Sequence, residues 1–70
     1  MPLAIAPLGQ DFTVVKIGTD DKMKRHLEDL GIIVGCKIRV SSDLSGNIVV
    51  LIKDCRMALD KDLAMKIQVS

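Results

Sequence analysis

Aromatic side chains are nearly absent from this sequence, which has one phenylalanine, Phe12, and no tryptophan or tyrosine. Grooves that bind proline-rich peptides are lined by aromatic rings, and proteins that bind single-stranded nucleic acids stack bases on such rings. The sequence therefore excludes an aromatic peptide groove and an aromatic stacking platform. Any partner must be recognised by other side chains.

The chain also lacks an excess of charge of either sign. Ten basic and nine acidic residues give a formal net charge of +1. A protein that neutralises many phosphates needs a concentrated basic surface, so we expect no nucleic acid as a partner.

Long apolar runs and dense cysteines are missing as well. The longest run, residues 48–52, is far shorter than the roughly 18 to 20 residues of a membrane-spanning helix, so no insertion into a membrane is expected. Residues 1–10 contain no lysine or arginine, unlike a secretory signal. Cys36 and Cys55 are too few for the disulfide framework of a small secreted domain. These features predict a cytoplasmic protein.

Enough hydrophobic residues are present for one compact core. They make up 49% of the sequence, and we predict a single domain over residues 1–70. The clearest element is an amphipathic helix over residues 19–30, where Met23, Leu27 and Leu30 form one apolar stripe that we expect to be buried.

Residues at both ends of this helix indicate where it begins and where it ends. Thr19 is the expected N-cap, and Gly31 is the expected stop because glycine readily adopts the left-handed conformation found there. Ile32 is then expected to pack on Leu27, as in a Schellman motif.

The remainder of the sequence predicts short strands. Apolar alternation and turn-forming residues mark five strands, tight turns and a helical turn: strands 12–17, 36–41, 48–52, 55–59 and 65–69, turns 34–35, 42–47 and 53–54, and a helical turn 60–64. Short strands joined by tight hairpins favour a small β-barrel, because closure removes exposed sheet edges.

Two segments resemble the FeoA family. Residues 25–40, RHLEDLGIIVGCKIRV, are similar to its helix, Leu-Gly-Ile, glycine turn and strand, and residues 56–60, RMALD, are similar to a later segment. Val34 stands where the family commonly has proline, and Cys55 stands where small residues are usual.

The resemblance implies a mainly β fold: a small SH3-like β-barrel of about five strands, with one amphipathic helix between the first and second strands. It also implies a cytoplasmic accessory of ferrous-iron uptake that contacts the cytoplasmic GTPase domain of a FeoB-type transporter. The alternative is a metal-linked regulatory module, related to the C-terminal SH3-like domain of diphtheria-toxin-repressor-type regulators. Weak self-association is left open.

No group of residues predicts catalysis, a metal or a cofactor. The chain has no Ser-His-Asp order and no glycine-rich phosphate loop, and its only histidine, His26, falls on the polar side of the helix. His26, Cys36 and Cys55 are scattered singly, whereas a metal site needs three or four converging ligands. We expect no enzyme activity, and we expect both cysteines to be small buried hydrophobic residues.

An aliphatic protein interface is the remaining hypothesis. Val49 and Leu51 alternate with Ile48, Val50 and Ile52, so both faces of this strand are apolar, and Leu44 at a loop tip extends the outward patch. Either a partner covers this face, or the helix or the N-terminal segment with Leu3, Ile5 and Leu8 does. A second candidate surface is the basic helix face with Lys24 and Arg25.

Overall fold

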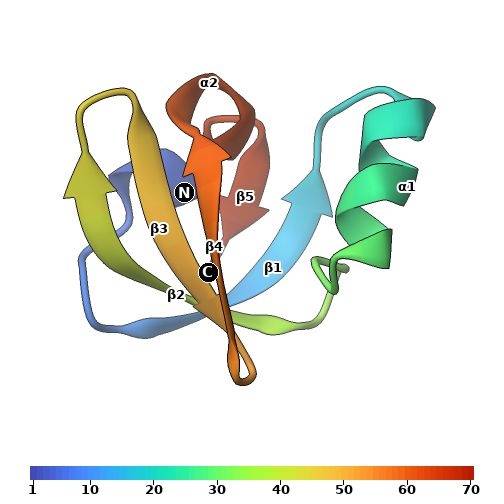
Figure 1. Ribbon diagram of the computed structural model, residues 1–70. Coiled ribbons are helices and arrows are strands. Elements are labelled where there is room, and N and C mark those ends of the chain that lie inside the picture. Colours follow the sequence, from blue (N-terminus) through green and yellow to red (C-terminus); the bar gives the residue numbers. More distant parts are fainter.

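The computed structural model describes all 70 residues and consists of a curled antiparallel sheet with short helical segments (Figure 1). The five strands lie in the order β4-β3-β2-β1-β5. The elements are η1 (Leu3–Ile5), β1 (Asp11–Ile17), α1 (Asp21–Asp29), β2 (Lys37–Leu44), β3 (Asn47–Ile52), β4 (Cys55–Asp60), α2 (Lys61–Ala64) and β5 (Ile67–Val69). A mainly β fold with one longer helix between the first two strands is therefore confirmed.

The sheet does not close, which corrects the prediction of a closed barrel. β4 pairs only with β3, while β5 pairs with β1 and with Pro2 through a single bridge. The two sheet ends are connected instead by packing, because α2 contacts β3, β4 and η1, and η1 contacts β5. Leu3 of η1 and Ala64 of α2 are fully buried. These helical segments supply core side chains where a closing ladder would otherwise lie.

The core follows the alternation of β3. Ile48, Val50 and Ile52 are buried, whereas Val49 and Leu51 on the opposite face are half-buried. The 15 buried residues form one cluster, and none of them is polar. The sheet thus has an apolar inner face and a distinct outer face.

The N-terminus of α1 lies one residue later than the sequence predicted. Asp20, not Thr19, is the N-cap, because its carboxylate accepts a hydrogen bond from the backbone N–H of Met23 at 2.8 Å. The Thr19 hydroxyl donates to the carbonyl of Asp20 at 3.2 Å. Both residue types can cap a helix, and the extended backbone of Asp20 decides between them.

Only one member of the predicted helix stripe is buried. Leu27 is inaccessible to solvent, but Met23 is 37% exposed and Leu30 is 43% exposed. The prediction that all three are buried is wrong, because this nine-residue helix contributes only Leu27 to the core. Neither helix has the length or the apolar content that crossing a bilayer requires.

The C-terminus of α1 is the predicted Schellman motif. Gly31 has a φ of 97°, and its N–H donates to the carbonyl of Glu28 at 3.0 Å. The N–H of Ile32 donates to the carbonyl of Leu27 at 2.9 Å, and both of these side chains are fully buried.

The predicted turns are present, with β2 longer than expected. The N–H of Cys36 donates to the carbonyl of Ile33 at 3.1 Å, closing the turn around Gly35. β2 continues to Leu44, because its pairing with β3 resumes after an irregularity at Ser41. The hairpin therefore turns at Ser45 and Gly46 only.

Three side chains are more exposed than the sequence predicted: the two cysteines, and Met65, whose alternation with Ile67 and Val69 predicted a core-facing side chain. Cys55 is exposed beside the β3–β4 turn and Cys36 is half-buried, so the prediction of two buried cysteines is wrong. Met65 is exposed because it caps the C-terminus of α2 and precedes β5, which begins at Ile67. Cys36 precedes β2 and Met65 ends α2, so neither lies in the strand that the alternation assigned to it, whereas Cys55 is in β4 but at its exposed first position.

Candidate functional site

The outer sheet face gathers the aliphatic residues predicted to bind a partner. We define it by Arg39 and Leu44 of β2, Val49 and Leu51 of β3, and Arg56 and Ala58 of β4. Residues paired across antiparallel strands project to the same face. Leu51 pairs with Arg39 and Arg56, Val49 pairs with Ala58, and Leu44 pairs with Asn47. Leu44, Val49 and Leu51 therefore share one face.

Neither element considered as a cover lies over this face. Leu3 belongs to the core, while Ile5 and Leu8 are 65% and 54% exposed. η1 packs against α2 and β5, and Figure 1 shows α1 following β1 at the other side of the molecule. Val49 and Leu51 are half-buried by neighbours within their own sheet, and Leu44 is exposed at the hairpin.

An ion pair borders the outer sheet face. The Nε of Arg39 donates to the Oδ1 of Asp11 at 2.9 Å, and both side chains are partly exposed. The hydrogen bond from Arg39 is the main reason that the pKa of Asp11 is held below its ordinary value. Arg56, on the other side of Leu51, forms no ion pair. Leu51 therefore lies between two arginines, Arg39 on β2 and Arg56 on β4.

Lys24 and Arg25 do not belong to this surface. They lie on α1, where Lys24 is half-buried and Arg25 is exposed. The structure divides the predicted partner-binding residues into a sheet group and a helix group.

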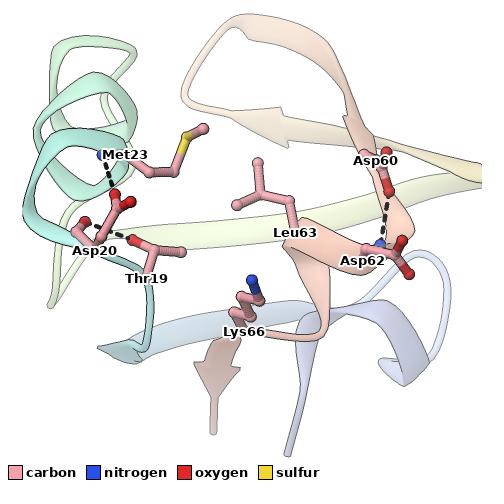
Figure 2. A pocket seen from close by; sticks show the side chains of 7 residues that line it. All are labelled: Thr19, Asp20, Met23, Asp60, Asp62, Leu63 and Lys66. Atoms are coloured by element: carbon pink, nitrogen blue, oxygen red, sulfur yellow. Dashed lines mark hydrogen bonds between the residues drawn. The ribbon is translucent and has the colours of Figure 1, made fainter.

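A second surface feature is a cleft of about 350 Å³ between the N-terminal ends of α1 and α2 (Figure 2). Met23 and Leu63 extend toward one another across it and form its apolar part. Its complete set of lining residues is Thr19, Asp20, Met23, Asp60, Asp62, Leu63 and Lys66. With three carboxylates and one ammonium group, the cleft suits an apolar side chain carried beside a basic group.

Two of the cleft carboxylates already stabilise the helices. Asp20 accepts from the N–H of Met23, and Oδ1 of Asp60 accepts from the N–H of Asp62 at 2.7 Å. These contacts satisfy backbone donors that have no partner within a helix. The acidic character of the cleft is therefore a consequence of helix capping.

Groups that commonly bind metal do not converge. His26 is exposed on α1, Cys36 lies just before β2, and Cys55 begins β4. No three histidine, cysteine, aspartate or glutamate side chains come together, and this includes the carboxylates of the cleft.

The cleft could not be predicted from the sequence. Its two sides are far apart along the chain, and the only local signals were the acidic residues at the start of each helix. A cap signal identifies a helix end but does not indicate which other helix end lies beside it.

Comparisons with known proteins point to one family, and the similarity extends over nearly the whole chain. The family described as the FeoA domain matches residues 1–70. The chain is 34% identical over 68 residues to the putative Fe(2+) transport protein A of Methanocaldococcus jannaschii, covering 97% of this chain and 83% of that protein.

Solved structures show the same fold in two settings. The iron uptake regulatory protein FeoA has a TM-score of 0.88 and 28% identity, covering 99% of this chain and 92% of its own. A manganese-dependent transcriptional repressor in complex with manganese has a TM-score of 0.89 and 27% identity, covering 100% of this chain but only 35% of the repressor.

Proposed function

The chain belongs to the FeoA family, and from this membership we propose that it is a cytoplasmic, non-enzymatic accessory of ferrous-iron uptake. Its partner is the cytoplasmic GTPase domain of a FeoB-type transporter, whose assembly or GTP-driven activity it affects. The family is related to ferrous-iron transport and is not a known enzyme family.

The observation that carries the proposal is the uncovered outer sheet face. Leu44, Val49 and Leu51 form an aliphatic centre on paired strands, and Arg39 and Arg56 flank Leu51. An apolar centre with a polar rim is the usual anatomy of a protein interface. The contact therefore combines burial of the aliphatic side chains with attraction of the unpaired guanidinium group of Arg56 to acidic residues on the transporter.

The outer sheet face is favoured over the cleft of Figure 2. The cleft offers only Met23 and Leu63 as apolar contacts, and its aspartates Asp20 and Asp60 are engaged in capping. A partner would have to compete with the helix ends for these carboxylates. The helix residues Lys24 and Arg25 remain a secondary contact in the proposal.

Calorimetric titration into the purified cytoplasmic domain of the transporter tests the proposal. We expect saturable binding without ferrous iron, measured with and without guanine nucleotide. Leu51→Arg should weaken binding by at least about tenfold, because it places a charge in the aliphatic centre. Met23→Gln in the cleft is the matched control and should bind like the wild type.

Two results would contradict the proposal. Absence of binding in every nucleotide state would show that the GTPase domain is not the partner. Loss of binding in Met23→Gln, with binding retained in Leu51→Arg, would show that the cleft and not the outer sheet face is the contact site. Circular dichroism of each variant separates loss of binding from loss of fold.

The second candidate is a metal-linked regulatory module, which the likeness to the manganese-dependent repressor favours. Equilibrium dialysis with ferrous iron and manganese separates the two functions. Stoichiometric binding that is lost on changing His26 or either cysteine would favour the regulatory module.

A further inference from the structure

We propose that β4 is a self-complementary sheet edge through which two copies of this chain associate, forming an antiparallel β4–β4 ladder centred on Ala58. This edge shares Arg56 and Ala58 with the outer sheet face, but it uses their backbone groups, and the inference does not depend on the transporter proposal. It rests on the direction of backbone groups in β4 and on the charges along that strand.

The register shows which backbone groups of β4 face away from the sheet. Hydrogen-bonded and non-hydrogen-bonded pairs alternate along an antiparallel ladder. The N–H of Lys61 donates to the carbonyl of Gly46 at 3.1 Å, and this contact continues the register that pairs Ile48 with Leu59. Counting by two from it, Leu59, Met57 and Cys55 direct their backbone groups toward β3.

The alternate residues Arg56, Ala58 and Asp60 therefore direct their N–H groups away from β3. All three residues are exposed, and no backbone or side-chain hydrogen bond outside the ladder involves Arg56 or Ala58. β4 pairs with no second strand and is one end of the open sheet. A strand edge with unpaired donors and acceptors is a template for another strand.

The side chains on this edge select a second copy as the occupant. In an antiparallel pair related by a two-fold axis at Ala58, each Arg56 lies opposite Asp60 of the other copy, and Ala58 lies opposite Ala58. Opposite charges directly across a ladder stabilise it, and the small alanines permit close approach at the axis. The exposed backbone groups of both copies are in phase in this register.

Other registers lack this pairing of opposite charges. An axis at Met57 or Leu59 also brings the exposed backbone groups into phase, but it places Arg56 or Asp60 opposite Ala58. Centring the axis on Arg56 places two arginines opposite one another, and centring it on Asp60 does the same for two aspartates. Like charges directly opposite are destabilising. The charge pattern thus favours the register centred on Ala58, in which Arg56 lies opposite Asp60, and Asp60 can take part while its Oδ1 caps α2.

A cysteine placed on the proposed axis tests both the contact and its register. Ala58→Cys in a Cys55→Ser background should form a disulfide-linked dimer under mild oxidation. Hydrogen-bonded antiparallel pairs have Cα atoms about 5.5 Å apart, within disulfide reach. The wild-type chain is the control, because its exposed Cys55 lies opposite position 61 of the other copy, far from the second Cys55.

Sedimentation velocity from micromolar to millimolar concentrations measures the association without cross-linking. We expect a concentration-dependent dimer that Arg56→Glu weakens at least about tenfold and Arg56→Lys retains. A wild-type chain that stays monomeric throughout overturns the proposal. Oxidation that links wild-type Cys55 as readily as Cys at position 58 overturns the register.

Discussion

Leu27 and Ile32 are joined by a hydrogen bond of 2.9 Å from the N–H of Ile32 to the carbonyl of Leu27, and both side chains are fully buried. This bond closes the end of α1 and places its one buried residue against the first core residue after the helix. The intervening Gly31 must adopt a φ of 97° for the bond to form. One glycine therefore couples the helix end to the core.

Replacing Gly31 tests this coupling. Gly31→Ala should lower the free energy of unfolding by about 1 to 2 kcal/mol, because alanine is strained at positive φ. Added bulk is a minor factor, since the nearest atom to a new Cβ is the Cγ2 of Ile52 at 4.0 Å. Urea denaturation measures the change. Gly31→Asn should lose less, because asparagine tolerates the left-handed region, and equal losses would contradict the conformational explanation.

In the β3–β4 turn, a residue other than glycine, Lys53, has a positive φ. Its φ is 54°, and it is the only non-glycine residue with positive φ. Lys53→Gly should raise the free energy of unfolding by about 0.5 to 1 kcal/mol, because relief of backbone strain outweighs the added freedom of the unfolded chain. The neighbouring Asp54→Gly should not stabilise. Thermal and urea unfolding measure the free energy of unfolding of both variants. If both variants were stabilised, the explanation by backbone strain at Lys53 would be wrong.

The ion pair between Asp11 and Arg39 predicts a pH effect. The hydrogen bond from Arg39 lowers the pKa of Asp11 in the folded chain. A carboxyl of this kind stabilises the fold above its unfolded-state pKa, and the contribution is lost as the pH falls through the folded-state pKa. In Arg39→Gln, the pKa of Asp11 should rise toward its ordinary value, as followed by carboxyl NMR titration.

Arg56→Gln is the matched control for this titration. It removes an exposed arginine from the same sheet face without touching the Asp11 ion pair. An equal rise of the Asp11 pKa in this variant would mean that the overall charge of the face, and not the hydrogen bond, sets the value.

The sequence predicted features that depend on a few adjacent residues. The stop at Gly31, the turn at Gly35, the hairpin at Gly46 and the inner face of β3 all appear where local patterns indicated. In each case a positive φ or a period of two acts within one short segment, so no knowledge of the distant chain was needed.

Features that depend on contacts between distant segments were not predictable. Closure of the sheet is replaced by packing of α2 and η1, and no local pattern distinguishes this arrangement from a fifth ladder. Met23 is partly exposed because it lines the cleft opposite Leu63, a residue far away in the sequence. The cleft likewise requires residues near Asp20 and Asp60 to meet in three dimensions.

The outer sheet face was predictable only in part. Alternation along β3 predicted that Val49 and Leu51 share a face, but only the register with β2 and β4 shows that Leu44 joins them and that two arginines flank Leu51. Period-two patterns assign faces within a strand, and pairing assigns neighbours across strands.

Truncating one valine on each face of β3 compares how much the two faces contribute to the free energy of unfolding. Val50 is fully buried, and Val50→Ala should lower the free energy of unfolding by about 2 kcal/mol through lost burial and a residual cavity. Val49→Ala should cost less than about 1 kcal/mol, because that side chain is only half-buried. Urea denaturation of both variants under identical conditions gives the comparison. Equal losses would mean that Val49 is packed as a core residue, and the outer sheet face would then offer a partner only Leu44 and Leu51 as aliphatic contacts.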